Sequence, residues 1–218
     1  MFRRCDMFQS LSIVSQLPHY ALAVLLGYLL GSSNMAVYLA KLRGVDLGAK
    51  GSGNPGTSNA VILMGWRAGV LTGFHDIGKA VAAVLLAKLL FPSLPMAGVV
   101  AGVACVIGHI FPFYLRFRGG KGFAAYLGMT LALNWKFALI LVAAIVVLLL
   151  VTDYIVVGTL ATVVSFPAYC AVTGRLLMAA ILAVASILIL YKHRVNFRRI
   201  LDGTEIGFRS ANRGDHRS

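Results

Sequence analysis

The chain has 218 residues, is 59% hydrophobic and only 12% charged, and has a mean hydropathy of +0.85. Soluble domains are about 45–50% apolar, so this composition excludes an ordinary soluble protein and indicates several membrane spans joined by short loops. The net charge of +13 does not imply a nucleic-acid partner. The basic residues lie at the ends of apolar stretches, where they set topology and can meet anionic lipid or a phosphorylated substrate.

In chain order, the apolar stretches predict an all-α, polytopic integral membrane bundle of about seven transmembrane helices. The expected spans are 20–42, 68–90, 96–111, 122–133, 137–151, 154–173 and 176–191. Polar residues interrupt the first span at 31–34, and the fourth is short. We assign 1–17 to an N-terminal extension, 18–208 to one membrane-embedded domain and 209–218 to a basic polar tail. The three Cys have no metal-binding spacing, and we expect no metal or cofactor.

Seven spans place the two termini on opposite sides of the membrane. One side holds the loops at 43–66, 112–121 and 152–153 together with the C-terminal tail. Its 14 basic residues are Lys41, Arg43, Lys50, Arg67, Arg116, Arg118, Lys121, Lys192, Arg194, Arg198, Arg199, Arg209, Arg213 and Arg217. The other side holds Arg3, Arg4, Lys88, Lys136 and Arg175. The positive-inside rule therefore predicts an outside N-terminus and a cytoplasmic C-terminus, with all the polar loops on the cytoplasmic face.

The first polar segment, residues 51–59, reads Gly-Ser-Gly-Asn-Pro-Gly-Thr-Ser-Asn. Gly and Pro disfavour regular structure, and Ser, Thr and Asn compete for backbone hydrogen bonds, so we expect neither helix nor strand here. Free backbone N–H groups with little side-chain bulk form a concavity that suits anions. We interpret the segment as an anion-binding loop, with a flexible linker as the alternative.

Asp76 and Lys79 lie inside the second predicted span, three residues apart and so on one helix face. Ionisable residues at such depth usually face a cavity or each other. Lys79 is either a ligand for a substrate anion, oriented by Asp76, or half of a self-neutralising pair that holds the bundle together. His75 beside them is interpreted as a polar helix-end residue. Residues 73–80 nearly match a phosphate-binding loop, but Ala80 replaces its hydroxyl residue and no strand precedes it, which argues against nucleotide hydrolysis.

Two further polar segments belong to the same face. Residues 108–122 contain His109, an aromatic and basic run, and Gly-Gly-Lys-Gly, which permits close backbone approach and presents Lys121 to phosphate. The aromatic and basic run alone also fits an anchor at the membrane interface. Residues 193–205 follow the last span. There His193, Asn196 and Arg199 recur at every third position, as one face of a helix that could close over the loops.

Together the three segments resemble the signature motifs of the bacterial acyl-phosphate:glycerol-3-phosphate acyltransferases, the PlsY family. The match runs through 51–59, then Asp76 and Lys79 with 108–122, and 193–205, in the family's order and over nearly the whole chain. The resemblance implies a multi-pass enzyme of the bacterial inner membrane with a cytoplasmic active site. Such an enzyme moves a fatty acyl group from acyl phosphate to the 1-hydroxyl of glycerol 3-phosphate. The products are lysophosphatidic acid and phosphate, in the first committed step of phospholipid synthesis.

The resemblance also implies roles for individual residues. Ser52, His193 and Asn196 would be catalytic, and the proton of the attacking hydroxyl would pass to His193 or to the donor's own phosphate. Acyl phosphate is already activated, so the enzyme works mainly by positioning and by stabilising the oxyanion. The implied substrate-binding residues are Gly51, Gly53, Asn54, Asn59, Asp76, Lys79, His109, Gly119, Gly120, Lys121, Gly122, Arg199 and Glu205. Glu205 would also tie the tail in place.

The chain departs from the family pattern at several positions. Gly48 stands where the family has Arg, with Lys50 as the nearest replacement, and Asp153, Val156 and Ala125 replace an Arg, a Ser and a Thr. Each change removes a donor or a positive charge near a phosphate site, so one alternative is a diverged paralogue with weak or altered activity. A non-catalytic binder or transporter of phosphorylated metabolites is another, although no inverted repeat is visible.

The thioester-dependent acyltransferases place an Asp five positions after a His, and no His here has that partner.

Overall fold

A computed structural model describes residues 2–49, 51, 53–205, 207 and 209, with side chains from Ser15 onward. This part of the chain is helical and contains no strand. Its elements are α1 (Phe2–Ser32), α2 (Met35–Arg43), α3 (Thr57–Met64), α4 (Trp66–Leu90), α5 (Ala97–Ile110), the 3-10 turn η1 (Phe113–Leu115), α6 (Phe123–Leu133), α7 (Trp135–Thr152), α8 (Ile155–Val172) and α9 (Leu176–Leu201). The predicted all-α bundle is confirmed.

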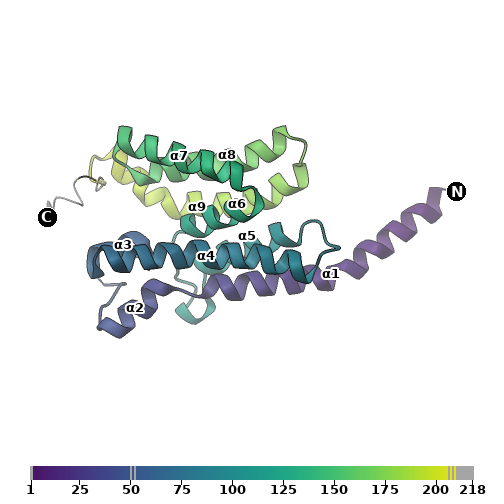
Figure 1. Ribbon diagram of the computed structural model, residues 1–218, viewed down its shortest axis with the longest axis horizontal. Coiled ribbons are helices and arrows are strands. Elements are labelled where there is room, and N and C mark those ends of the chain that lie inside the picture. Colours follow the sequence, from purple (N-terminus) through teal and green to yellow (C-terminus); the bar gives the residue numbers. More distant parts are fainter. Residues whose placement is uncertain (1, 50, 52, 206, 208, 210–218) are drawn as a thin grey trace.

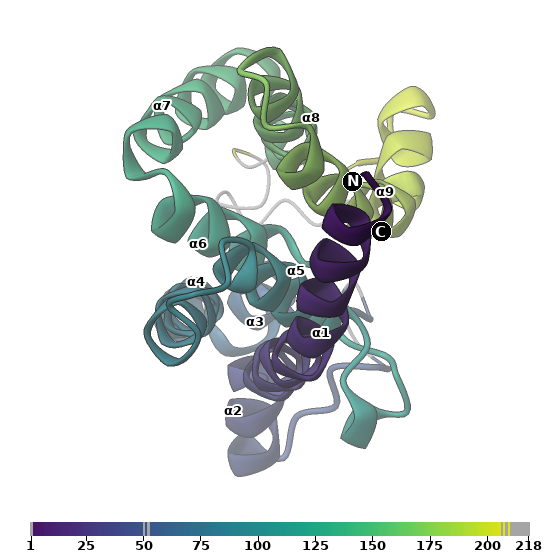
Figure 2. The same ribbon diagram turned by 90° about the vertical axis from the view of Figure 1, so that its right-hand side faces the viewer.

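The helices form one elongated bundle. Helix α5 packs against α1, α4, α6 and α9, while α7 and α8 lie on the side away from α1 and α2 (Figure 2). The short helices α2 and α3 lie at the same end of the bundle as the end of α9, and the start of α1 extends beyond the opposite end (Figure 1). This arrangement agrees with the prediction that the polar segments gather at one end of the molecule.

Six helical segments are long and apolar enough to cross a membrane. They are Ser15–Arg43, Trp66–Leu90, Ala97–Leu115, Trp135–Thr152, Ile155–Val172 and Leu176–Leu201. The predicted fourth span corresponds to α6, which has only 11 residues. At 1.5 Å per residue it rises about 16 Å, roughly half of the ~30 Å hydrocarbon core. The count of seven complete spans and the sidedness of the termini therefore stay predictions.

Helices α1 and α5 approach closely through two glycines spaced as Gly-x-x-x-Gly. A Cβ at Gly27 would overlap the backbone carbonyl of Ala101, and one at Gly31 would overlap that of Cys105. Apolar packing gives little driving force between helices in lipid, so van der Waals contact between close backbones stabilises the pair. This close crossing holds the end of α1 beside the end of α5.

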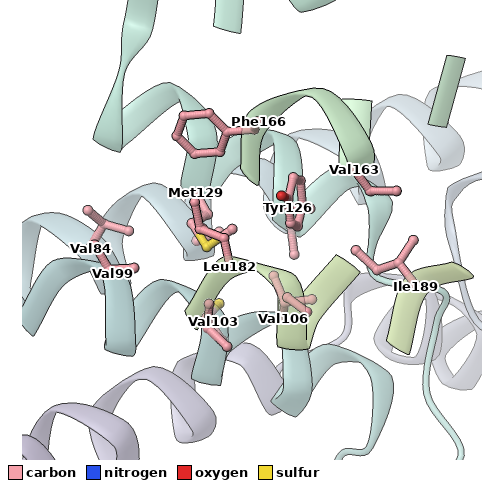
Figure 3. Packing of buried hydrophobic residues seen from close by; sticks show 14 of the residues in the cluster. Val84, Val99, Val103, Val106, Tyr126, Met129, Val163, Phe166, Leu182 and Ile189 are labelled. Carbon is pink, nitrogen blue, oxygen red and sulfur yellow. The ribbon is translucent and has the colours of Figure 1, made fainter. Parts of the chain in front are cut away.

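A buried apolar cluster joins α4, α5, α6, α8 and α9 (Figure 3). Tyr126 of α6 lies inside it, and its hydroxyl is 3.1 Å from Ser186 Oγ of α9. Ser186 in turn donates to the backbone carbonyl of Val163 in α8 at 2.7 Å. Because Ser186 donates to that carbonyl, the Tyr126 hydroxyl donates to Ser186. The two buried hydroxyls are thus satisfied while linking three helices.

Two local expectations about the polar segments can be compared with the structure, and one of them needs correction. The prediction of no helix within 51–59 is wrong at its end, since α3 begins at Thr57 with Gly56 as its N-cap. Ser, Thr and Asn disfavour helix interiors but suit the first turn, which explains the error. The predicted interruption of the first span is confirmed. The chain leaves the helix at Ser33, and the Asn34 side chain accepts from Val37 N and caps α2.

We predict that replacing Gly31 by Ala separates α1 from α5, because the added methyl group has only backbone atoms to displace. The expected loss is about 1–3 kcal/mol of stability, measured as faster thermal inactivation in detergent. Gly78→Ala is the matched control, since a Cβ at Gly78 meets no atom within 4 Å. Equal thermal behaviour of the two variants would contradict the close crossing.

Candidate active site

The first group of polar residues is a buried ion-pair network around Lys79. The Lys79 ammonium lies 2.9 Å from Asp76 Oδ1, 2.9 Å from His109 Nδ1 and 2.6 Å from the backbone oxygen of Ser33. Asp76, Lys79 and His109 are all buried. An ammonium can only donate, so it forms hydrogen bonds to His109 Nδ1 and to the Ser33 oxygen, and the Asp76 carboxylate balances its charge. The network joins α4 and α5 to the break between α1 and α2.

The His109 ring connects this network to the Gly-Gly-Lys-Gly loop. Lys79 can only donate, so Nδ1 of His109 accepts, and the ring proton of the neutral imidazole is on Nε2. A Cβ at Gly120 would overlap Nε2, and Gly120 N donates to the backbone oxygen of His109 at 3.1 Å. Gly119 N donates likewise to Ile110 O at 3.0 Å. The two glycines let the loop lie flat against His109, which places Lys121 directly beyond it.

The 44–59 loop is held by its own polar side chains. Asp46 Oδ1 accepts from Gly48 N at 2.8 Å and from Ala49 N at 3.1 Å, while buried Asn59 donates to Leu47 O at 3.1 Å. Gly51 adopts a left-handed φ of 63° and packs against Asn59 without room for a Cβ. These contacts indicate an ordered loop at the described positions, in line with the anion-loop interpretation and against a flexible linker. Ser52 and Lys50 lie outside the described residues.

The loop lies beside the Lys79 network. Asn34 donates to Pro55 O at 3.0 Å, so the residue that follows Ser33 also holds the loop. A groove of about 650 Å³ runs between α2, this loop and the 115–118 segment. Gly48 and Gly53 line it, together with the basic residues Lys41 and Arg118. Asn54 is half-buried, and its backbone oxygen accepts from Gly56 N at 2.9 Å.

The second group of polar residues forms a chain from the glycine loop to the tail. Lys121 Nζ donates to Asn196 Oδ1 at 2.6 Å, and Asn196 Nδ2 donates to Glu205 Oε1 at 2.6 Å. Helix α9 continues unbroken to Leu201, so the predicted helical face of 193, 196 and 199 is confirmed. Glu205 N donates to Arg199 O at 3.0 Å, which turns the tail back toward the helix.

His193 is buried on the same face of α9, one turn before Asn196. Its Nδ1 lies 2.9 Å from the backbone oxygen of Ile189, and because a carbonyl can only accept, Nδ1 carries the proton. In the neutral imidazole, Nε2 therefore has a free lone pair that can accept a proton. Asn196, one turn further along α9, holds Lys121, so His193 and Lys121 belong to the same polar group.

Lys121 is a partly buried cation in a basic environment. Burial lowers the pKa of its ammonium below the usual value, the nearby Arg199 and Lys192 lower it further, and Glu205 opposes the shift. Arg199 is exposed at the mouth of this group. An anion bound here would gain from both Lys121 and Arg199 and would offset the repulsion between them.

The structure thus divides the predicted site residues into two groups. The buried group of Asp76, Lys79 and His109 uses its polar atoms internally, which favours the alternative that the Asp76–Lys79 pair holds the bundle together. The second group contains the partly buried or exposed Lys121, Asn196, Arg199 and Glu205 together with buried His193. Gly122 ends the glycine loop with a φ of 92° where α6 begins. Substrate contact by any of these residues stays a prediction.

Residues missed by the sequence analysis belong to the buried group. Ser33 Oγ lies 3.0 Å from His75 Nε2 and accepts from Tyr38 at 3.2 Å. His75 lies in the middle of α4 with Nδ1 3.5 Å from Asp76 Oδ1, so its interpretation as a helix-end residue is wrong. The usable signals were the interruption at 31–34 and the one-turn spacing of His75 and Lys79.

An integral membrane protein that gathers glycine loops, basic side chains and an available imidazole at one end of its bundle is suited to bind and convert phosphate-bearing molecules. The family model described as glycerol-3-phosphate acyltransferase matches residues 21–203. The chain therefore belongs to the glycerol-3-phosphate acyltransferase family, and the resemblance drawn from its motifs is confirmed.

Individual relatives agree with this assignment. Glycerol-3-phosphate acyltransferase 1 of Oceanobacillus iheyensis is 33% identical, with 86% of this chain and 94% of the relative covered. The glycerol-3-phosphate acyltransferase of Coxiella burnetii is 36% identical, with 85% and 96% covered. The crystal structure of PlsY in its glycerol 3-phosphate form matches with a TM-score of 0.82 at 32% identity, covering 88% of this chain and 97% of that one. The lysophosphatidic acid form of PlsY matches with a TM-score of 0.78 at 33% identity, covering 87% and 95%.

We predict that Lys79→Met destabilises the protein strongly, because it leaves the Asp76 carboxylate buried without its cation. The expected loss is about 3–5 kcal/mol, measured by thermal unfolding in detergent, and Asp76→Asn in the same chain should recover much of it. Lys88→Met on the exposed face of α4 is the control. A variant at Lys79 with unchanged stability and weakened substrate binding would instead assign Lys79 to the substrate.

Proposed function

We propose that this protein transfers a fatty acyl group from acyl phosphate to the 1-hydroxyl of glycerol 3-phosphate and releases lysophosphatidic acid and phosphate. The observation that carries the proposal is that one face of α9 holds both Asn196, which fixes Lys121 at 2.6 Å, and His193, whose Nδ1 is bonded to Ile189 O so that Nε2 can accept a proton. A phosphate-binding cation and a base side by side are what an alcohol bearing a phosphate requires. The PlsY structures that this chain resembles are a glycerol 3-phosphate form and a lysophosphatidic acid form.

The acceptor binds through its phosphate to the Lys121 side of the site. Lys121 and Arg199 supply charge, and the glycine loop lets the substrate approach the backbone closely. Asn196 orients the ammonium, and Glu205 orients Asn196. This leaves the 1-hydroxyl directed at His193.

The reaction exchanges one carbon–oxygen bond for another and moves one proton. The 1-hydroxyl oxygen attacks the acyl carbonyl carbon, and the C–O bond to phosphate breaks as phosphate leaves. We assign the hydroxyl proton to Nε2 of His193. Phosphate is a good leaving group, so positioning and stabilisation of the carbonyl oxygen contribute most of the rate enhancement.

The donor phosphate binds at the loop of residues 51–59, which is ordered at its described positions. Gly51, Gly53 and Asn54 belong to this loop, and the groove beside it is lined by Lys41 and Arg118. These two cations stand in for the Arg that the family pattern has at position 48, because Gly48 lines the same groove. Asn59 stabilises the loop by donating a hydrogen bond to Leu47 O. Ser52 is proposed to contact the donor as the motif implies.

The site faces the cytoplasm of a bacterial cell, at the inner membrane. The support is the positive-inside rule together with the clustering of α2, α3 and the end of α9 at one end of the bundle. A transporter would place its site near the middle of the membrane, so this clustering at one end favours the enzyme.

The test is turnover by the purified protein in detergent with acyl phosphate and glycerol 3-phosphate, following phosphate release. We predict that His193→Ala lowers kcat/KM by about 100-fold or more, the usual contribution of a general base. His19→Ala, exposed near the opposite end of the bundle, is the control. Normal turnover of His193→Ala would assign the proton to the donor's phosphate instead. Intact substrate binding with no turnover in the wild-type protein would overturn the enzyme proposal.

We also predict that the KM for glycerol 3-phosphate rises as the pH becomes alkaline. The lowered pKa of Lys121 means that its ammonium loses its proton, and with it the attraction for phosphate, at a lower pH than a lysine in water. Lys121→Arg should remove this rise, because a guanidinium stays charged throughout the range. Lys136→Arg, an exposed lysine at the start of α7, should leave it in place. A rise that persists in Lys121→Arg would show that another group titrates.

A further inference from the structure

The turn after α7 contains an unusual conformation. Asp153 adopts a left-handed φ of 66° at the C-terminal end of that helix. Glycine and asparagine are the usual residues there, because a Cβ is disfavoured in this region. Asp also occurs there more often than most residues, so the conformation alone does not explain its presence, and the contacts of its carboxylate are the relevant observation.

The Asp153 carboxylate binds the C-terminal tail. Oδ1 accepts from the backbone N of Arg209 at 2.9 Å, and the Arg209 guanidinium lies within 3.9 Å of the same oxygen and also donates to Leu150 O. A Cβ at Gly207 would overlap Oδ2, so the tail backbone packs directly on the carboxylate. The two residues are 56 positions apart in the chain. The tail is thus attached to the α7–α8 turn at Gly207 and Arg209.

The same tail is attached to the site at Glu205. Its carboxylate accepts from Asn196, which accepts in turn from Lys121. Glu205 and Arg209 are four positions apart in the chain, so fixing one of them restricts the other. The described contacts join Asp153 to the tail at Gly207 and Arg209, and they join the tail to the Lys121 ammonium at Glu205.

We propose that Asp153 is a positioning residue for the acceptor site, acting through Arg209 and Glu205 on Asn196 and Lys121. The inference rests on the proposed binding of glycerol 3-phosphate at Lys121. It assigns a purpose to the Asp that replaces the family's Arg in this turn. The Asp153 and Arg209 side chains are 27% and 60% exposed, so their ion pair by itself adds little stability. Its effect is on the placement of Glu205.

Asp153→Gly is the most informative variant, because glycine suits the left-handed turn and removes only the carboxylate. We expect unchanged or higher thermal stability and a KM for glycerol 3-phosphate raised about fivefold or more, as for the loss of one net hydrogen bond. The kcat should change less. Asp153→Asn retains an acceptor oxygen and tolerates the turn, so it should restore most of the affinity. Asp202→Asn, another exposed acid near the end of α9, is the control.

A double-mutant comparison tests the path itself. If Asp153 acts through Glu205, adding Asp153→Gly to Glu205→Ala should raise KM no further. Fully additive effects would overturn the proposed path, as would an unchanged KM in Asp153→Gly alone.

Hydrogen exchange gives a readout that does not depend on activity. The Arg209 amide should be protected in the wild type and should lose protection in Asp153→Gly but not in Asp202→Asn. An Arg209 amide equally exchangeable in all three proteins would overturn the tether, even if the acyltransferase assay succeeds. Protection without any turnover would sustain the tether and reject the proposed function.

Discussion

The arrangement of the whole polar end depends on one buried ammonium, that of Lys79. A charge buried among helices is costly to desolvate and is tolerated only when acceptors surround it. Asp76, His109 and the Ser33 carbonyl provide these acceptors from α4, α5 and the end of α1. The end of α1 also has unsatisfied carbonyls and the negative end of the helix dipole, so the ammonium is well placed there. Because the buried charge needs these acceptors, it fixes the positions of the three elements that carry them.

Both loops that we propose to bind the substrates are positioned by this network. On one side Ser33 leads directly to Asn34, which caps α2 and binds Pro55 of the 44–59 loop. On the other side the ring of His109 supports Gly120 and so the placement of Lys121. A site that must hold reacting groups within a fraction of an ångström needs such a rigid supporting layer. The buried residues thereby support the residues that we propose to contact the substrate.

The sequence was sufficient to predict the helical membrane bundle, the gathering of three polar segments and the helical face at His193, Asn196 and Arg199. These features follow from apolar length, charge placement and local periodicity, all of which are local signals. The sequence did not predict contacts between residues that are distant in the chain. His75 lies in α4 and its partner Ser33 lies in the break between α1 and α2, and their 42-residue separation leaves no local pattern. The start of α3 was missed for a different, local reason. It lies inside a Gly-, Ser- and Pro-rich segment, and residues that disfavour a helix interior favour its first turn.

The departures expected from the family pattern also show that sequence positions alone do not predict the charge at a site. A position-by-position comparison counts Asp153 as a lost cation, although the field at a site depends on where charges lie in space and not on their residue numbers. The tail brings the Arg209 guanidinium to that turn, so the local charge is balanced instead of negative. At Gly48 the comparison again finds only a loss, yet the groove that Gly48 lines also contains Lys41 and Arg118. The two cases differ in what the remaining cations can do. Arg209 is neutralised by its acid and serves to hold the tail, whereas no ion pair engages Lys41 or Arg118 within the described residues, and both keep their charge for an anion.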